Sequence, residues 1–207
     1  MDGTLTVQPS ATAPGLLLRP WTEQDIPAMV AAHRDPVIRR WLRHPVTTDE
    51  QAHRVIEAHR ASRRAGTGFA FAVLQADPHD TAGNPIGAVM LHRLGDEAIS
   101  GEVGYWVTAP WRGRGIAPRA LSATCEWAFR LPRLRPLEQL KLIHSVSNHP
   151  SCRVADKAGF ALSAVLPPLL PEFPHDGHLH IRLAGQPQAI TQTRLSRSAS
   201  NWRLPYQ

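Results

Sequence analysis

The fold is decided by the stretch Tyr105-Trp-Val-Thr-Ala-Pro-Trp-Arg-Gly-Arg-Gly-Ile-Ala117, in which an apolar strand-like run leads into a basic turn and the start of a helix. Gly113 and Gly115 allow a tight turn whose backbone N–H groups converge on one anion. The helix adds unpaired N–H donors and the positive end of its dipole, and Arg112 and Arg114 suit bidentate contact with phosphate oxygens. The stretch therefore predicts a phosphate-binding junction.

Two common phosphate motifs do not fit this turn. A dinucleotide loop needs Gly-x-Gly-x-x-Gly, but Pro118 stands where the third glycine belongs. A mononucleotide loop needs Gly-x-x-x-x-Gly-Lys-Ser/Thr, and neither lysine nor Ser/Thr follows Gly115 at that spacing. A dinucleotide-dependent enzyme stays an alternative, and retention of a nicotinamide or flavin nucleotide would favour it.

The pattern that remains, Arg112-x-x-Gly115-x-Ala117, resembles the pyrophosphate-binding signature Gln/Arg-x-x-Gly-x-Gly/Ala of the GNAT superfamily of acyl-CoA N-acyltransferases. The resemblance runs from about residue 16 to residue 184. Further segments follow the order and spacing of the family, namely residues 16–21, 22–25, 85–90, 148–151 and 157–160. The most similar branch acetylates protein N-termini and includes the ribosomal-protein alanine and serine acetyltransferases.

The expected fold is of the α/β class, with the three layers of the GNAT fold. Runs rich in β-branched and aromatic residues predict a mixed, mostly antiparallel sheet of about seven strands, and amphipathic segments predict helices on both of its faces. We expect a flexible N-terminal tail over residues 1–15, an N-acetyltransferase domain over residues 16–184 and a C-terminal tail over residues 185–207. The strands are expected at residues 16–19, 69–75, 86–94, 101–107, 140–146, 161–166 and 179–183.

The composition favours an anionic ligand and excludes several other classes. The 207 residues carry a net charge of +6, almost all of it from arginine, but no dense basic tract with interleaved aromatic residues predicts nucleic-acid binding. No apolar run approaches the roughly 20 residues of a membrane span, and residues 1–14 lack the parts of a signal peptide. Cys125 and Cys152 form no disulfide framework, so we expect a cytoplasmic protein.

The eleven histidines do not predict a metal site. His175, His178 and His180 are close in sequence, but they fall in a proline-rich loop and the adjoining strand without a clear ligand geometry. Neither a Cys-x-x-Cys motif nor a Cys/His ligand spacing occurs. We therefore interpret these histidines as facing solvent or substrate, and no metal is expected.

The resemblance implies that the co-substrate is acetyl-CoA. Its pantetheine arm is expected between the strand that ends at Trp106 and Val107 and the strand over residues 140–146, bonded to the backbone of Trp106 and Val107. The Val107 N–H is the expected oxyanion donor. Asn148 corresponds to a family residue that bonds the pantetheine or a bulged backbone, although it also suits a helix cap. The pyrophosphate is expected at Arg112, Gly113, Arg114, Gly115, Ile116 and Ala117.

Glu102 is the expected catalytic base. It is a lone carboxylate in an apolar strand, five residues before Val107, and partial burial would raise its pKa and help it accept a proton. In the family the strand carboxylate often lies one position away, and a β-bulge decides which residue faces the cleft. Glu172, His175 and Asp176 in the late loop are alternatives.

Ser151 is the expected acid that protonates the departing thiolate. Many relatives carry a tyrosine for this purpose at the position of Ala155, and its absence here favours the branch in which serine is found. Cys152 is not expected to act as a nucleophile, because no histidine at a recognisable position activates it and His149 precedes the helix.

The sequence thus predicts direct transfer of an acetyl group from acetyl-CoA to a primary amine. The acceptor site is expected between residues 34–68 and residues 167–177. A protein or peptide N-terminus, a small-molecule amine and an amino acid all stay open as acceptors, and so does a homodimeric assembly. A catalytically silent acyl-CoA-binding module of the same fold is the alternative from another functional class.

Overall fold

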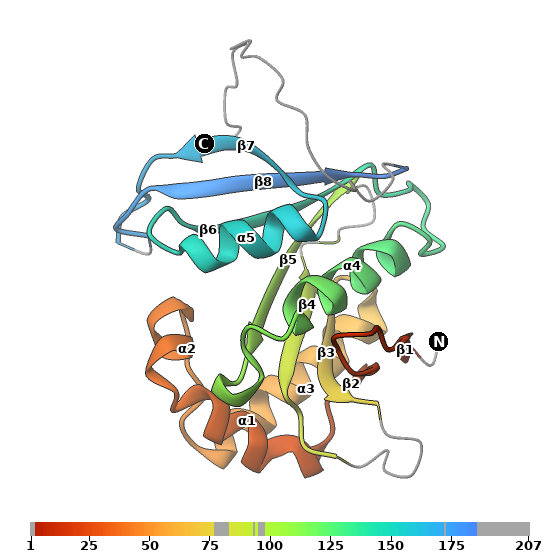
Figure 1. Cartoon of the computed structure of the whole chain (residues 1–207), viewed down its shortest axis with the longest axis vertical. Coiled ribbons are helices and arrows are strands. Elements are labelled where there is room, and N and C mark those ends of the chain that lie inside the picture. Colours follow the sequence, from red (N-terminus) through yellow and green to blue (C-terminus); the bar gives the residue numbers. More distant parts are fainter. Residues whose placement is uncertain (1–2, 77–82, 93, 95–97, 172, 186–207) are drawn as a thin grey trace.

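The structure is a computed structural model that describes residues 3–76, 83–92, 94, 98–171 and 173–185. Figure 1 shows the course of the chain. The strands are β1 (Leu5–Val7), β2 (Leu16–Pro20), β3 (Phe69–Gln75), β4 (Gly87–His92), β5 (Ser100–Val107), β6 (Gln139–Ser145), β7 (Ala161–Leu166) and β8 (Gly177–Leu183). The α-helices are α1 (Ile26–His33), α2 (Pro36–Trp41), α3 (Asp49–Ala65), α4 (Ile116–Ala128) and α5 (His149–Lys157), and short 3-10 turns cover Glu23–Asp25 and Ala109–Trp111.

Within these residues the strands form one eight-stranded sheet in the order β1-β2-β3-β4-β5-β6-β8-β7. Every neighbouring pair is antiparallel except β5 and β6, which run parallel. The prediction of a mixed, mostly antiparallel sheet is therefore confirmed. The strand beyond the seven expected ones is β1.

Strand β1 corrects the prediction that residues 1–15 are flexible throughout. Leu5 pairs with Leu18 and Val7 with Leu16, so β1 extends the sheet at its edge. Leu5 and Val7 pack against the core, and Arg119 of α4 donates hydrogen bonds to the carbonyls of Pro14 and Gln8. Three residues with alternating apolar and polar side chains are enough to form this strand, because the segment adds to the edge of an existing sheet and contacts α4. At the other end of the chain, residues 186–207 lie outside the described residues.

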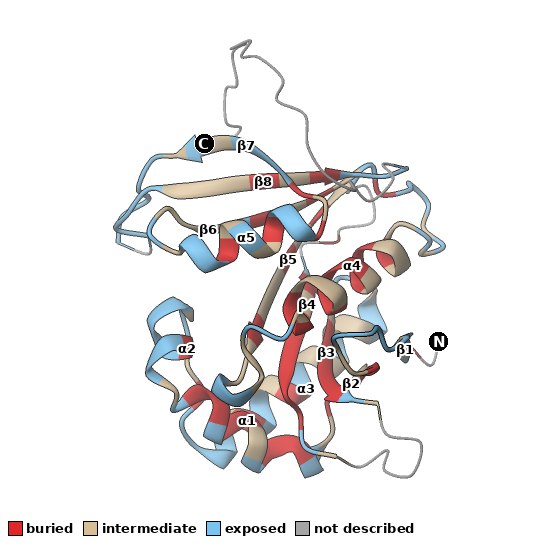
Figure 2. Ribbon diagram, in the orientation of Figure 1, coloured by how far each residue is buried: buried red, intermediate tan, exposed pale blue. Residues whose placement is uncertain are grey.

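Two apolar cores lie on the two faces of the sheet (Figure 2). The core beneath α4 and α5 contains Leu121 and Ala155 with the β-strand residues Phe71 and Val103. The core beneath α1 and α3 contains Met29, Ile56 and Trp106 among others. Because consecutive strand residues point to opposite faces, β5 directs Val103, Tyr105 and Val107 toward α4 and α5, and Glu102 and Trp106 toward α1 and α3. The expected three-layer arrangement is confirmed.

Helix ends follow the local signals in the sequence where those signals are strong. Helix α3 begins with a capping box between Thr48 and Gln51, and it ends at Gly66, which adopts a left-handed φ of 70°. Helix α2 was not expected from the sequence. Asp35 caps it by accepting hydrogen bonds from the N–H groups of Val37 and Ile38. The same carboxylate contacts Arg112 in the turn before α4.

Candidate functional site

The parallel strands β5 and β6 separate halfway along their length. They pair from Ser100 and Gln139 to Val103 and Leu142. Beyond this point β5 continues to pair with β4 as far as Val107, while β6 continues to pair with β8 as far as Ser145. Figure 1 shows β5 running away from β6 toward the lower half of the molecule. The expected divergence is therefore present, and it leaves the inner edges of Gly104–Val107 and Ile143–Ser145 facing one another; we refer to this space as the gap.

The backbone of β5 offers hydrogen-bonding groups to the gap at alternate residues. The Thr108 N–H donates to the Ile86 carbonyl at 3.0 Å, and β4 and β5 pair without a register shift across their described residues. In an antiparallel ladder the groups of Trp106 must then also point to β4, whereas those of Tyr105 and Val107 point to the gap. The backbone groups of Trp106, at which the pantetheine contact is expected, therefore point to β4, and those of Tyr105 and Val107 face the gap. Val107 keeps the orientation that an oxyanion donor needs.

The turn after β5 presents backbone N–H groups at the start of α4. Gly113 and Gly115 have φ values of 76° and 72°, a left-handed conformation that glycine adopts without strain. Gly115 is the N-cap of α4, so no side chain caps the first turn of this helix. Ile116 and Ala117 bury their side chains in the core and hold the helix start in place. The turn thus has the donor arrangement of an anion site.

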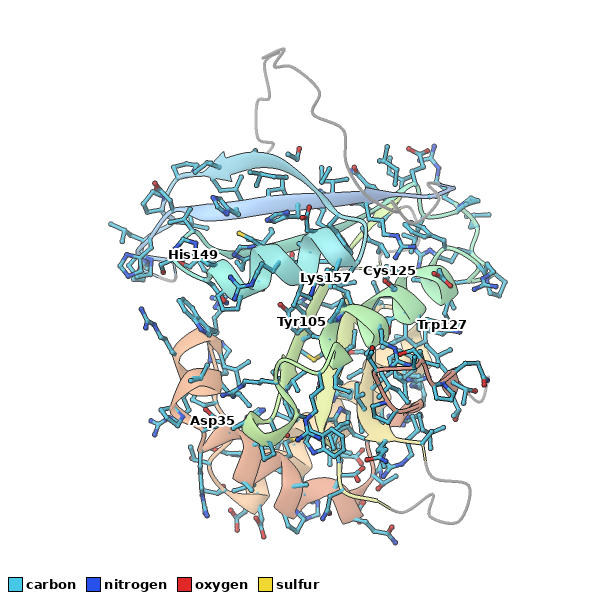
Figure 3. All side chains as sticks on the ribbon, in the orientation of Figure 1. Asp35, Tyr105, Cys125, Trp127, His149 and Lys157 are labelled. Atoms are coloured by element: carbon cyan, nitrogen blue, oxygen red, sulfur yellow. The ribbon has the colours of Figure 1, made fainter. Side chains whose placement is uncertain are left out.

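The Arg112 guanidinium is hydrogen-bonded to other groups of the protein. Its Nε donates to the Val107 carbonyl at 3.0 Å, and its Nη2 lies 2.6 Å from Oδ2 of Asp35 at the start of α2. Asp35 lies beside the turn before α4 in Figure 3. Burial alone would raise the pKa of Asp35, but hydrogen bonds from the Val37 N–H and Arg112 hold it below its usual value. Arg112 therefore connects the end of β5, the turn and α2.

Arg114 also differs from the expected arrangement. Its guanidinium carbon lies 5.1 Å from the centre of the Trp111 ring, so the two side chains stack on the surface of the turn. A cavity of about 520 Å³ lies beside Gly115 and includes Arg119 and Lys157 in its wall. Arg119 and Lys157 thus place two cationic side chains in the wall of this cavity.

Tyr105 and Ser151 form a hydroxyl pair across the two halves of the sheet. The Tyr105 Oη lies 2.7 Å from the Ser151 Oγ, and Ser151 is only 6% exposed in the first turn of α5. Burial raises the pKa of Tyr105 to about 12, with a smaller opposing effect of the Ser151 hydrogen bond, so the phenol stays protonated at neutral pH. Tyr105 lies beneath α5 in Figure 3. The sequence did not single out this tyrosine, because only the fold brings it to Ser151.

Asn148 precedes α5 and lies next to the gap end of β6. It is the N-cap of the helix, but its side chain makes no capping hydrogen bond; its backbone carbonyl accepts from the Ser151 N–H at 2.9 Å. The interpretation of Asn148 as a side-chain helix cap is therefore wrong. Its amide is half-buried near the place where the sequence predicts pantetheine.

Glu102 lies in the part of β5 that is still paired with β6, opposite Lys141. Its carboxylate is 3.7 Å from Nε2 of His92 and its side chain is 20% exposed. Five residues of extended strand separate Glu102 from Val107, so their Cα atoms are about 16 Å apart. A carboxylate at this distance cannot touch an amine that attacks a thioester held at Val107. Glu102 as the base and Val107 as the oxyanion donor therefore act in one reaction only if a chain of waters connects them.

The two segments expected at the acceptor site do meet. A cavity of about 520 Å³ is lined by Arg40 from α2 and by His175 and Asp176 from the loop between β7 and β8, together with Val146, Ser147, Pro168 and Pro174. His175 and Asp176, which the sequence offers as alternative bases, thus line one cavity. Glu172 lies outside the described residues.

Cys152 has a histidine partner, contrary to the sequence-based expectation. Its Sγ lies 3.2 Å from Nδ1 of His178. The expectation was wrong because β6 pairs with β8, and this pairing carries His178 beneath α5 although 26 residues separate it from Cys152.

Within the part of the chain that the structure describes, no helix combines the length and the apolar character needed to cross a bilayer.

Comparisons with known proteins agree with this geometry. The family described as "Acetyltransferase (GNAT) domain" matches residues 15–161. A sequence search of the curated proteins found no match. Among solved structures, the chain is similar to Mycobacterium smegmatis RimJ in complex with CoA-disulfide, with a TM-score of 0.72, 21% identity and coverage of 88% of this chain and 86% of that one.

Two further solved structures have comparable similarity. RimL, a ribosomal L7/L12 alpha-N-protein acetyltransferase in complex with coenzyme A, has a TM-score of 0.70 at 20% identity and covers 86% of this chain and 97% of its own. The microcin C7 self-immunity acetyltransferase MccE, in complex with acetyl-CoA and AMP, has a TM-score of 0.70 at 14% identity, with coverage of 84% and 97%. The fold, the diverging strands and the family match over residues 15–161 together identify the chain as a member of the GNAT acetyltransferase family.

Proposed function

We propose that the protein transfers the acetyl group of acetyl-CoA to the α-amino group of a protein N-terminus. The observation that carries this proposal is the gap between β5 and β6. The Val107 N–H faces it from β5, the Tyr105–Ser151 pair joins its two sides, and the uncapped start of α4 follows β5. A thioester in the gap meets an oxyanion donor and a proton donor at once. RimJ and RimL, which share the fold, were both solved with coenzyme A bound.

The cofactor would bind mainly through backbone groups. The pyrophosphate accepts hydrogen bonds from the N–H groups of residues 113–117, and the pantetheine pairs with the backbone of Tyr105 and Val107 like an added strand. The nucleotide end extends into the cavity beside Gly115, where Arg119 and Lys157 supply positive charge. Arg112 acts as a positioning residue, because its guanidinium holds the Val107 carbonyl and Asp35.

The reaction needs no covalent enzyme intermediate. The neutral amine attacks the thioester carbonyl carbon, and the Val107 N–H stabilises the negative oxygen of the tetrahedral intermediate. When the intermediate collapses, the C–S bond breaks and the thiolate takes a proton from the Ser151 hydroxyl, which takes one in turn from Tyr105. The attacking nitrogen releases its surplus proton to solvent, and solvent returns one proton to Tyr105, so the protons balance. The hydroxyl pair therefore supplies an acid although Ala155 stands where many relatives carry tyrosine.

The amine must lose a proton before it attacks, and the acceptor cavity contains the groups for this step. His175 and Asp176 line that cavity, whereas Glu102 lies about 16 Å along the strand from Val107. We therefore prefer His175 or Asp176 to Glu102 as the proton acceptor. The alternative of a catalytically silent module finds no support in the family match or in this arrangement.

The surface around this cavity suits a protein acceptor better than a small molecule, which would need an enclosed pocket. Leu169, Leu170 and Phe173 of the adjoining loop are 63%, 73% and 43% exposed, an apolar rim of the kind that contacts a polypeptide. RimL, by its description, acetylates a protein N-terminus. MccE shares the fold and is linked to microcin immunity, so a small-molecule amine is the competing acceptor class.

The test is an acceptor screen with acetyl-CoA. It compares peptides with free N-termini, the same peptides with blocked N-termini and an internal lysine, and small-molecule amines, with thiol release and product mass as readouts. We expect acetylation of free N-termini and none of the blocked peptides. Turnover with small amines alone would overturn the acceptor class, and absence of both CoA binding and thiol release would overturn the enzymatic proposal.

A further inference from the structure

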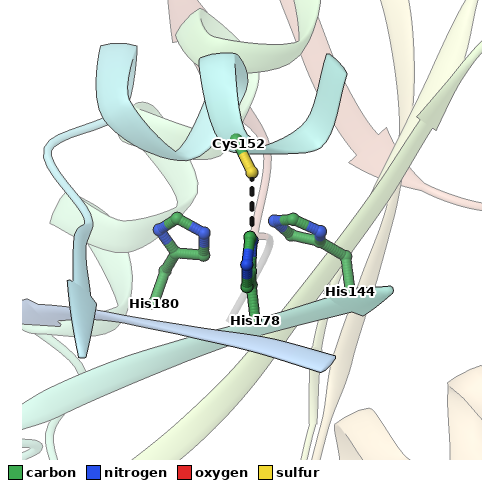
Figure 4. A group of neighbouring side chains, drawn as sticks. All are labelled: His144, Cys152, His178 and His180. Carbon is green, nitrogen blue, oxygen red and sulfur yellow. Dashed lines mark hydrogen bonds between the residues drawn. The ribbon is translucent and has the colours of Figure 1, made fainter. Parts of the chain in front are cut away.

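Four side chains that typically bind transition metals meet between α5 and the sheet (Figure 4). They are His144 on β6, Cys152 on α5, and His178 and His180 on β8, and we refer to them as the histidine–cysteine cluster. One ligand atom from each of these residues lies within 4.8 Å of all the others. The cluster is separate from the proposed reaction, which uses none of the four.

The fold assembles the cluster from three elements. His144 lies directly opposite His178 in the antiparallel pair of β6 and β8, and His180 lies two residues further along β8, on the same face. Cys152 points from α5 toward these rings, as Figure 4 shows. Elsewhere apolar residues fill the interface of α5 with the core, since Ala155 of the helix and Ala158 directly after it are fully buried. The cluster therefore replaces apolar packing at one end of the interface by ligand-type side chains.

Several nitrogens of the cluster are buried without a partner. His180 is only 5% exposed, and the Phe160 backbone near its ring does not reach good hydrogen-bond geometry with either ring nitrogen. Nε2 of His144 is likewise buried and unpartnered. Buried polar groups are almost always satisfied in folded proteins, so these nitrogens are available to a ligand from outside the chain.

The hydrogen bonds around the cluster prepare its nitrogens for a metal. Nδ1 of His144 lies 2.8 Å from the Ser145 carbonyl, which can only accept, so Nδ1 carries the hydrogen and Nε2 carries the lone pair.

We propose that the histidine–cysteine cluster binds one zinc ion with His144, Cys152, His178 and His180 as its four ligands. Imidazole and thiolate are the ligands that zinc prefers, and four of them suit its tetrahedral coordination. Zinc would hold the four atoms about 3.3 to 3.6 Å apart, so the farthest pair must approach by about 1 Å. Cys152 and His178, at 3.2 Å, are already at that spacing. Binding displaces the thiol proton of Cys152 to solvent.

The ion would join α5 to β6 and β8. Ser151 immediately precedes Cys152, so the same ion would fix the helix turn that carries the proposed acid. The site is structural in this proposal, and acetyl transfer itself needs no metal chemistry. The proposal also does not depend on the identity of the acceptor amine.

The test is a titration of the chelator-treated, full-length protein with Co²⁺ and Zn²⁺ in the absence of CoA, whose thiol binds the same ions. We expect one Co²⁺ per chain, with the absorption of tetrahedral cobalt and a thiolate-to-cobalt charge-transfer band, and stoichiometric displacement by Zn²⁺. We also expect zinc to raise the melting temperature of the wild-type protein. A folded wild-type protein that binds neither ion stoichiometrically would overturn the proposal.

Matched variants assign the ligands. Cys152→Ser removes the charge-transfer band, and His180→Asn weakens zinc binding by more than about 100-fold, because even an outer-shell change can cost that much. Cys125→Ala, which removes the other thiol, and His149→Gln, which removes an exposed histidine of α5, keep both the band and the affinity. Retention of the band in Cys152→Ser, or full affinity in His180→Asn, would refute the assignment. If either variant fails to fold, the wild-type titration still decides whether the site exists.

Discussion

The hydroxyl of Tyr105 lies 2.7 Å from the hydroxyl of Ser151, and this contact joins the two halves of the sheet where β5 and β6 have separated. Tyr105 belongs to the strand whose backbone faces the gap, and Ser151 belongs to the first turn of α5. In the proposed reaction, the serine that protonates the thiolate is already hydrogen-bonded to a phenol with a pKa of about 12. The pair is fully protonated at neutral pH, so it has a proton to deliver, and solvent reprotonates it quickly afterwards.

This pair predicts unequal losses in two variants. Ser151→Ala should lower kcat by about 100-fold or more, within the range of general acid catalysis, while the KM for acetyl-CoA changes little. Tyr105→Phe should lower kcat on the order of 10-fold, the effect of one hydrogen bond, because Ser151 remains. Steady-state kinetics with a peptide acceptor measures both. Ser163→Ala on the exposed face of β7 is the control, and equal losses in Ser163→Ala and Ser151→Ala would contradict the assignment.

The separation of Glu102 from Val107 leads to a second prediction. Glu102→Gln should lower kcat by less than about 3-fold, whereas the combined His175→Gln and Asp176→Asn variant should lower it by about 100-fold through loss of the base. The ratio of the two kcat values is the measurement, with circular dichroism to confirm folding. A large loss in Glu102→Gln with little loss in the loop variant would restore Glu102 as the base through a chain of waters.

Local signals in the sequence were sufficient for the turn after β5 and for the elements of the fold other than β1 and α2. A capping box or a left-handed glycine acts through neighbours in the chain, so its effect can be predicted without knowing the rest of the structure. Side-chain partners are different, because the packing of distant elements decides them. The pairs missed by the sequence analysis are Tyr105–Ser151, Arg112–Asp35 and Cys152–His178, which are 46, 77 and 26 residues apart.

The left-handed glycine Gly113 allows a test of the phosphate turn with an internal control. A Cβ at Gly113 meets nothing within 4 Å in the structure, and the same is true of Gly66, which has a similar φ of 70° at the end of α3. Gly113→Ala and Gly66→Ala should therefore each lower the free energy of unfolding by about 1 kcal/mol through backbone strain. Only Gly113→Ala should also raise the KM for acetyl-CoA, by about 10-fold or more, because its methyl group occupies the space of the pyrophosphate. A similar KM change in Gly66→Ala would show that the effect is general destabilisation.

The link between Arg112 and Asp35 predicts that the two side chains are energetically coupled. A double-mutant cycle of Arg112→Gln and Asp35→Asn, followed by urea unfolding, should give a coupling free energy of about 1 kcal/mol, since the pair is partly exposed. Glutamine can still donate to the Val107 carbonyl, so this variant isolates the contact with Asp35. If Arg112 instead acts only through phosphate, Arg112→Gln should raise the KM for acetyl-CoA without any coupling to Asp35.

The same pair has a defined pH dependence. The pKa of Asp35 is lowered in the folded protein, so its contribution to stability is present above the ordinary aspartate pKa of about 4 and is lost as the pH falls through the lower folded value. The stability difference between the wild-type protein and Asp35→Asn should therefore shrink below about pH 4. A difference that stays constant from pH 6 to pH 3 would show that Asp35 acts only as the cap of α2 through neutral hydrogen bonds.

The register of β5 predicts which amides the cofactor covers. The Trp106 and Thr108 N–H groups point to β4, and Thr108 donates to Ile86, so both should exchange slowly in the free protein. The Tyr105 and Val107 N–H groups point to the gap and should exchange faster. Coenzyme A should slow the amide exchange of Tyr105 and Val107 by about 10-fold or more beyond the effect of general stabilisation. The exchange of the Thr108 amide measures that general effect. Hydrogen exchange followed by NMR measures each amide separately. Protection of Trp106 without Tyr105 and Val107 would mean that the strand is shifted by one residue, and the oxyanion donor would then no longer be Val107.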